Sequence, residues 1–215
     1  VCDGIFQDKI EVANHPTQAG AAPGRLIYRD INGNGVIDDN DRCIIGDPNP
    51  DLSMGINLAF KYKAFALDMF FAGDFGFEIQ NHMKRQLYSM NYGNLATNRG
   101  ADILNAWTPT NTNTGIPALS LTDDNNESRF STYYVEDGSY MKMKYLKLSY
   151  SLPRNIIGKI GASNLDVYGQ VENVFTITGY SGLDPELLPG EYGACIDNGA
   201  YPRPRTFTVG LNLQF

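Results

Sequence analysis

The last eleven residues of the chain end in a strict alternation between apolar positions and polar or glycine positions. Every odd position from Phe207 to Phe215 carries an apolar side chain, and none of the even positions between them does. This period of two is typical of a strand with one apolar and one polar face. A length of about 9 to 11 residues suits a strand that crosses a lipid bilayer. The pattern therefore predicts a transmembrane β-strand over residues 205–215.

Four further segments alternate in the same way. They lie at residues 52–62, 64–74, 140–152 and 165–175. A residue or two near Tyr62 and Lys63 separates the first two, which predicts a tight hairpin. The third changes phase near Tyr145, which predicts a β-bulge, and Pro153 should end it because proline has no N–H to donate. In the fourth segment, Asn173 occupies an apolar position and interrupts the pattern.

The connections between these segments alternate in length. Two are short, near Lys63 and over residues 153–164, and two are long, over residues 75–139 and 176–204. An up-and-down barrel places both short connections at one end and both long ones at the other, which is the asymmetry of outer-membrane barrels. We therefore expect an all-β fold in which five antiparallel strands belong to a larger transmembrane barrel. Closure needs about eight strands, so the others must come from outside this sequence or from another chain.

The two faces of these strands have different expected environments. Lipid should contact the apolar residues of the last strand, which are Phe207, Val209, Leu211 and Leu213. A hydrated lumen should contact the polar residues of the last two strands, which are Thr208, Asn212, Gln214, Gln170 and Glu172. In the first long loop we expect short helices, around residues 78–91 and 102–107.

Composition and charge agree with a β-rich membrane protein. Gly (22), Tyr (13) and Phe (11) are frequent, no run of about 18 apolar residues could form a membrane helix, and the mean hydropathy of −0.29 is compatible with alternating strands. The net charge is −7 and no Lys/Arg cluster occurs. These features exclude nucleic acid as a partner, because phosphate binding requires clustered cations.

The cysteine and histidine positions predict no zinc site. Cys2, Cys43 and Cys195 form no Cys-x-x-Cys motif, and His15 and His82 stand alone. An oxidising envelope would allow one disulfide, but three cysteines leave one over. The sequence leaves open whether two of them pair or all three are free.

Residues 30–41 follow the spacing of a calcium-binding loop. The candidate ligands are Asp30, Asn32, Asn34, the Val36 carbonyl, Asp38 acting through water, and Asp41. Gly35 occupies the sixth position, where the chain must turn sharply, and Asp41 replaces the usual glutamate at the twelfth. No helices are expected to flank the loop, so an EF-hand domain is not implied. The alternative is a tight turn without an ion, because Asn, Asp and Gly readily form such turns.

No enzymatic motif is present. The chain has no Gly-x-Ser-x-Gly, His-Glu-x-x-His or Walker sequence, and the calcium-like loop lacks the third glycine of a dinucleotide-binding turn. We expect no catalytic residues and no required cofactor, with Ca²⁺ as the one candidate ion. The first residue is Val1, so we expect a fragment or a processed piece.

Several segments, taken in order, resemble the C-terminal part of SusC/RagA-type TonB-dependent transporters of the Bacteroidota. They are Ile27-Tyr-Arg-Asp-Ile-Asn-Gly-Asn-Gly-Val-Ile-Asp-Asp-Asn-Asp-Arg42, Ile45-Gly-Asp-Pro-Asn-Pro-Asp51, the hairpin over residues 54–71, Trp107-Thr-Pro109, Ile116-Pro117, Tyr134-Val-Glu-Asp-Gly-Ser-Tyr140, Leu146-Lys-Leu-Ser-Tyr-Ser-Leu-Pro153, Asn173-Val-Phe175 and the terminal strand. A C-terminal strand that ends in Phe215 also resembles the usual assembly signal of outer-membrane barrels.

This resemblance implies a barrel of about 22 strands in the outer membrane, to which residues 1–215 contribute the last five. The plug domain, and the segment that contacts TonB-ExbB-ExbD, would lie outside this sequence. Such transporters import oligosaccharides or peptides with a SusD-like surface lipoprotein. By resemblance, the loops over residues 75–139 and 176–204 help to seat that lipoprotein, or else fold over the mouth as a constriction. The alternative from another class is a soluble β-sandwich adhesin or carbohydrate-binding module with a structural calcium loop.

Overall fold

The computed structural model describes residues 1–90, 98–158, 161–187 and 195–215. These residues form two compact units. The sheet unit comprises Asn49–Phe77, Asp137–Glu186 and Ala200–Phe215, and the loop-rich unit comprises Val1–Pro48, Glu78–Glu136 and Leu187–Gly199.

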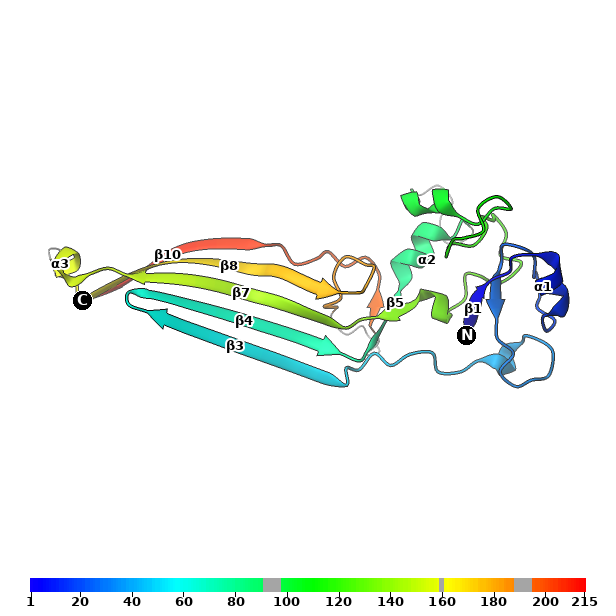
Figure 1. Cartoon of the computed structure of the whole chain (residues 1–215), viewed down its shortest axis with the longest axis horizontal. Helices are drawn as coiled ribbons and strands as arrows, with labels where there is room; N and C mark the ends of the chain where they lie inside the picture. Colours follow the sequence, from blue (N-terminus) through cyan, green and yellow to red (C-terminus); the bar gives the residue numbers. More distant parts are fainter. Residues whose placement is uncertain (91–97, 159–160, 188–194) are drawn as a thin grey trace. The chain divides into compact units, whose positions relative to one another are not determined.

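The sheet unit contains one five-stranded antiparallel sheet (Figure 1). Its strands are β3 (Leu52–Tyr62), β4 (Phe65–Phe75), β7 (Tyr140–Ser151), β8 (Asn164–Thr178) and β10 (Thr206–Gln214). Their order across the sheet is β10-β8-β7-β4-β3. The prediction of five antiparallel strands is confirmed. The last part of β8 was not expected to be strand, and it forms because Thr178 pairs with Tyr140 at the start of β7.

The phase change in β7 arises from the predicted bulge. Tyr145 lies opposite Phe70 of β4, and Met143 lies opposite Phe71, so Lys144 is an extra residue in β7. The neighbouring strand β8 is irregular at the same level, where Asn173 has a φ of 52°. The left-handed backbone of this asparagine explains why a polar residue interrupts the apolar series there.

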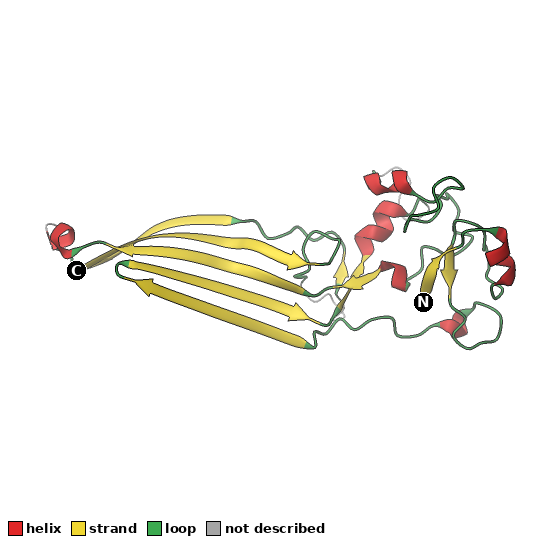
Figure 2. Cartoon of the chain, in the orientation of Figure 1, coloured by secondary structure: helices red, strands yellow, loops and turns green. Residues whose placement is uncertain are grey.

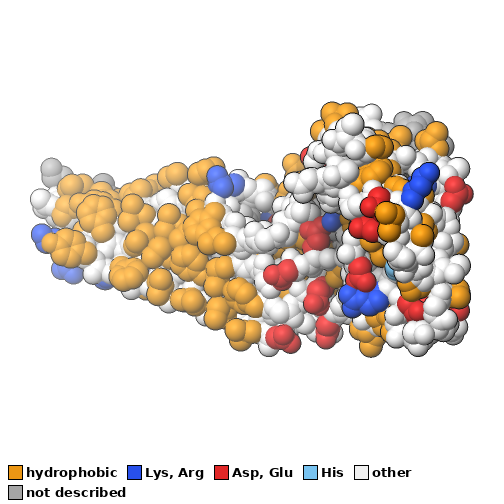
Figure 3. All heavy atoms as spheres, turned by 45° about the vertical axis from the view of Figure 1, so that its right-hand side comes forward, with side chains coloured by type: hydrophobic (Ala, Val, Ile, Leu, Met, Phe, Trp, Pro, Cys, Tyr) orange, Lys and Arg blue, Asp and Glu red, His pale blue; other side chains and the backbone are white. Residues whose placement is uncertain are grey.

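One face of the sheet is apolar across all five strands. Phe207, Val171, Leu146, Met69 and Leu58 lie opposite one another in successive strands, and the next rows repeat this pattern. Exposed fractions of large side chains on this face reach 73% for Phe207, 69% for Leu211 and 83% for Val209. In Figure 3 hydrophobic side chains gather over the long strands. The opposite face carries Thr208, Gln170 and the other residues assigned to a lumen, as expected from the register.

Both short connections lie at the same end of the sheet (Figure 2), because β3 and β7 run in the same direction. The β3–β4 hairpin turns through Lys63, whose φ is 53°, and Ala64. The β7–β8 connection contains the short helix α3 (Arg154–Ile157), which begins directly after Pro153. Proline suits this position because its missing N–H would have no partner inside the helix.

Short elements make up the loop-rich unit, apart from Asp137, the last residue of β6, which belongs to the sheet unit. They are β1 (Cys2–Ile5), α1 (Lys9–Asn14), β2 (Leu26–Tyr28), η1 (Asp39–Asp41), β5 (Glu78–Asn81), α2 (His82–Tyr88), η2 (Ala101–Asn105), η3 (Thr132–Tyr134), β6 (Val135–Asp137) and β9 (Ile196–Asp197). No helix in the described part of the chain is long and apolar enough to span a membrane.

The predicted helix over residues 78–91 is wrong in its first turn. Glu78–Asn81 is strand β5, which pairs in parallel with β9 through Gln80 and Ile196. The helix α2 starts only at His82, where the Asn81 side chain accepts a hydrogen bond from the Lys84 amide and caps it. Residue 91 lies outside the described residues. The helix expected over residues 102–107 is the shorter 3₁₀ helix η2.

A small core and a buried polar network hold the loop-rich unit together. Ile5, Leu26, Tyr28 and Trp107 pack against one another and are nearly inaccessible. Glu127, exposed by only 6%, accepts hydrogen bonds from the Leu26 amide at 3.0 Å and from the Arg25 guanidinium at 2.9 Å. These contacts join segments about 100 positions apart in the chain.

Candidate functional site

The calcium-like loop folds around its own side-chain oxygens. The Asp30 carboxylate accepts hydrogen bonds from the amides of Gly33 and Gly35, both at 2.7 Å. Asn32 accepts one from the Asn34 amide at 2.9 Å, and Asn34 accepts one from the Val36 amide at 2.8 Å. The tight turn that the sequence predicted is therefore present, and its glycines adopt positive φ values of 72° and 82°.

Asp41 closes the loop. One of its oxygens accepts from the Ile31 amide at 2.8 Å, and the other accepts from the Asp38 amide at 2.8 Å. The hydrogen bond from Asp38 is the main reason that the pKa of the Asp41 carboxyl is lowered, and the amides of Ile31 and Asn32 add to it against the effect of desolvation. Asp38 itself caps the 3₁₀ helix η1 by accepting from the Asn40 amide at 2.7 Å.

These hydrogen bonds explain how the loop keeps its conformation without an ion. Calcium binding at the loop stays a prediction. Among the described residues, no group of three or more His, Cys, Asp or Glu side chains lies close enough together to hold a metal. Two of the six predicted ligands are asparagines and one is the Val36 carbonyl, so half of the ligand positions would offer neutral oxygens. Such sites bind calcium weakly, with dissociation constants on the order of 10⁻⁴ to 10⁻³ M in extracellular modules.

We expect the Asp41→Asn variant to lose calcium binding at this loop, because it removes the charge at the position that closes the site. Asp39→Asn is the matched control, since Asp39 lies in the same turn, is 81% exposed and pairs with Arg42. Calorimetric titration of the purified full-length protein with CaCl₂ measures the number of sites. The prediction is wrong if Asp41→Asn and Asp39→Asn bind the same number of calcium ions as the wild type.

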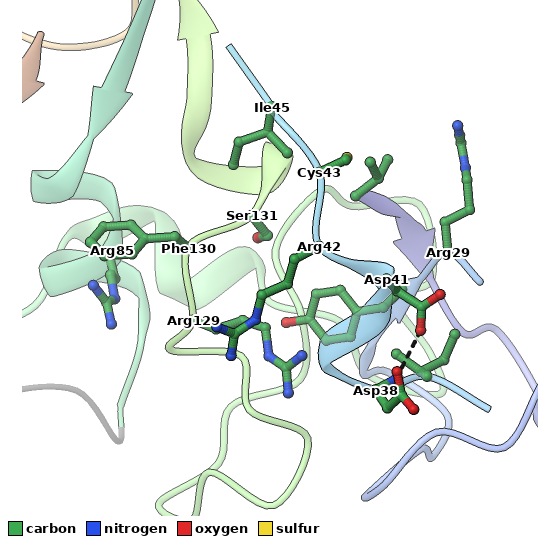
Figure 4. A pocket seen from close by; sticks show the side chains of 13 residues that line it. Arg29, Asp38, Asp41, Arg42, Cys43, Ile45, Arg85, Arg129, Phe130 and Ser131 are labelled. Carbon is green, nitrogen blue, oxygen red and sulfur yellow. Dashed lines mark hydrogen bonds between the residues drawn. The ribbon is translucent and has the colours of Figure 1, made fainter. Parts of the chain in front are cut away.

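A pocket of about 450 Å³ lies beside this loop (Figure 4). Cationic side chains from separate segments line it, and Figure 4 labels Arg42 and Arg129 among them. The Arg129 guanidinium lies 5.1 Å from the ring centre of Tyr28, and that of Arg85 lies 4.8 Å from the ring centre of Phe130. Stacking of this kind helps to position a guanidinium. Contacts within the protein thus position the side chains of Arg129 and Arg85 in the pocket wall.

No disulfide joins any two of the three cysteines, and this answers the question that the sequence left open. All three lie in the described part of the chain, and none forms a disulfide. The Cys2 thiol lies 3.7 Å from the Gly4 carbonyl oxygen, and the Cys195 thiol lies 3.6 Å from that of Pro48. Both are placed as ordinary weak donors to the backbone.

A charged cluster that the sequence analysis did not single out lies on the polar face of the sheet. The Lys142 ammonium contacts Asp184 at 2.9 Å and Glu186 at 2.8 Å, and Lys144 also pairs with Glu186. Burial alone would raise the pKa of the Glu186 carboxyl, but the hydrogen bonds from the two lysines outweigh it and hold that pKa below its usual value. A sequence signal was available, because two lysines in a strand expected to cross a membrane point to a specific role.

Relatives with similar sequences cover almost the entire chain. It is 40% identical over 99% of its length to "TonB-dependent receptor P3" of Formosa agariphila, and 32% identical over 90% of its length to "TonB-dependent receptor SusC" of Bacteroides thetaiotaomicron. The chain spans 21% and 18% of those two proteins, respectively. No protein-family model matches the chain.

Solved structures agree with the sequence relatives. The chain superimposes on the "RagAB peptide transporter" with a TM-score of 0.74 at 25% identity, over 93% of this chain and 22% of the other. It superimposes on the "RagAB peptide importer in the 'closed-closed' state" with a TM-score of 0.71 at 26% identity, over 100% of this chain and 22% of the other. The relatives are named receptors, transporters and importers, in agreement with the expectation that the chain is not an enzyme.

Proposed function

Because the chain belongs to the SusC/RagA-type TonB-dependent transporters and matches their C-terminal barrel portion, we propose that it forms part of the barrel wall of an outer-membrane importer of oligosaccharides or peptides. The observation that carries this proposal is the apolar face that crosses all five strands. Lipid is the environment in which such a face is stable while no other layer of protein covers it.

The edges of the sheet support the same interpretation. β3 and β10 are the outermost strands of the described sheet, and each pairs on one side only. Unpaired backbone groups at a sheet edge are not tolerated in the hydrocarbon core, so both edges must be covered by other strands. We propose that the remaining strands of a barrel of about 22, together with the plug that fills it, come from the other part of the protein.

A soluble β-sandwich is the less favourable alternative. Its two sheets would pack face to face, about 10 Å apart, and bury their apolar residues between them. On the described sheet, however, Phe60, Leu148 and Val209 keep exposed fractions of 57%, 51% and 83%. Patches of this kind on a monomeric soluble protein would promote aggregation.

Uptake by intact cells tests the proposed function. Cells that lack the full-length gene should fail to take up some members of a panel of fluorescent oligosaccharides and peptides, and uptake of those members should also need TonB and the proton-motive force. Unchanged uptake of every panel member, or recovery of the full-length protein in the soluble fraction, would contradict the proposal.

We propose two kinds of protein partner for the complete transporter. TonB-ExbB-ExbD would couple energy through the N-terminal part, outside this sequence. A SusD-like lipoprotein would contact the long connection over residues 75–139, which carries strongly exposed apolar side chains. Leu104 in η2 is 90% exposed and Leu121 is 68% exposed. Exposed apolar residues on a loop are suited to burial at an interface.

The double variant Leu104→Glu/Leu121→Glu should reduce recovery of the lipoprotein from native membranes in mild detergent. Each residue would weaken binding by about 2 kcal/mol or more if it lies at the centre of the interface. Deleting the loop would be a poor test, because it carries the core residue Trp107 and the buried Glu127. The matched control is Ile44→Glu, which introduces a charge at a 94% exposed position outside the two long connections. Equal recovery from the double variant and the control would rule out the seating role.

A further inference from the structure

Lys142 is a buried lysine on the polar face of the sheet. It lies opposite Ala72 of β4 and Thr176 of β8, and its side chain is only 2% exposed. Burying an ammonium group costs several kcal/mol unless carboxylates pair with it. Asp184 supplies two oxygens at 2.9 and 3.0 Å, and Glu186 supplies one at 2.8 Å. The burial of Lys142 therefore depends on the segment that carries these two carboxylates.

The bulge in β7 adds a second cation to the same cluster. Lys144 is the extra residue of the bulge, next to Tyr145, and it shifts the alternation of β7 by one position. As it is, the Lys144 ammonium donates to the second oxygen of Glu186. Two lysines from the strand thus meet two carboxylates from the segment that follows β8.

That segment, residues 179–186, is here called the strap. Directly before the strap, the Thr178 hydroxyl donates a hydrogen bond to the Ser139 carbonyl at 2.9 Å. This bond joins the last residue of β8 to the residue that precedes β7. Tyr180 is 6% exposed, and its ring lies so close to Gly182 that a side chain there would come within 2.3 Å of it. The Glu186 amide donates to Asp184 at 3.0 Å and holds the two carboxylates together. The strap therefore has an ordered structure of its own.

We propose that the strap is a fixed, inward-folded part of the lumen wall, clamped by Lys142 and Lys144, and not part of the surface that binds the lipoprotein. This inference rests on the proposed function, because it takes the polar face of the sheet to be the lumen face. The connection over residues 176–204 then has two parts. The strap narrows the path of the ligand through the lumen, and the residues after the strap form the other part. The sequence left two roles open for this connection, which were to seat the lipoprotein or to form a constriction. The strap forms the constriction.

Hydrogen–deuterium exchange of the full-length transporter, purified with its partner in mild detergent, tests the clamp. In the Asp184→Asn/Glu186→Gln variant, amides of the strap should exchange at least about tenfold faster, because the buried ammonium loses its countercharges. Lys142→Met should have the same effect from the strand side. Lys147→Met is the matched control, since Lys147 lies on the polar face of the same strand and makes only a ring contact, with Tyr168, among the described residues.

The proposal requires that recovery of the lipoprotein stays at the wild-type level in the strap variants. Unchanged exchange of the strap in both clamp variants, or loss of the lipoprotein from them, would overturn it. Cysteines placed singly at Thr208 and Leu211, in lipid-reconstituted protein without native cysteines, separate this result from the proposed function. Equal labelling of both by a water-soluble maleimide would contradict the assignment of the two faces, and with it the proposed function, while the exchange data would still report on the clamp.

Discussion

Replacing Leu211 with arginine should destabilise the assembled transporter by roughly 2 to 4 kcal/mol, the cost of a cation near the middle of the bilayer. Leu211 is next to the centre of β10, is 69% exposed and belongs to the apolar face with its neighbour Val167. On a soluble sheet the same substitution at so exposed a position would have little effect. The amount of folded, heat-modifiable protein in the outer membrane measures the loss.

Asn212→Lys is the control for this substitution, because it introduces a cation at the next position on the opposite face. Asn212 lies opposite Asp166 in β8, so a lysine there would face water and a carboxylate. We expect assembly at the wild-type level. Equal assembly of both variants would show that the two faces of β10 have similar environments, and the lipid assignment would then be wrong.

Replacing Glu127 with alanine should cost about 3 to 5 kcal/mol in the free energy of local opening of the loop-rich unit, because it leaves a buried cation without its partner. The side chains of Arg25 and Glu127 are both largely buried. The substitution also removes the acceptor of the Leu26 amide, in the most buried part of β2. Exchange of the β2 amides in the full-length transporter measures the opening.

Asp39→Ala is the control for charge removal, since the pair between Arg42 and Asp39 is 76% and 81% exposed. Pairs in water contribute little to stability, so exchange in β2 should not change. A double-mutant cycle with Arg25→Ala would isolate the pair itself. If Glu127→Ala alters β2 exchange no more than Asp39→Ala does, the polar network is not what holds this unit together.

The alternation of side chains was sufficient to predict the sheet. A period of two places Phe207 and Leu211 on one face whatever their neighbours are, and the chain positions of Tyr145 and Pro153 marked the bulge and a strand end. The signal is local, and in a membrane barrel every strand repeats it. Family resemblance added the transporter interpretation, which agrees with the relatives and solved structures.

Calcium binding at residues 30–41 stays a prediction, and the structure shows how the loop itself is built. The spacing of Asp30, Gly35 and Asp41 predicted a closed loop, and the structure contains one, with the side-chain oxygens bound to backbone amides. Whether those oxygens also bind an ion depends on charge and on the competition between amides and calcium. Spacing alone does not determine either of these.

Sequence by itself determined where the five long strands lie, which face of each is apolar and where the short connections turn, because these properties depend on residues only a few positions apart. Only the tertiary structure decided that Glu78–Asn81 is a strand, that Glu127 holds β2, and that the strap is clamped to β7. In each case the partner is distant in the chain: β9 for β5, Arg25 for Glu127, and Asp184 for Lys142. The free energy of a buried ion pair or of strand pairing comes from that partner, and local periodicity carries no information about it.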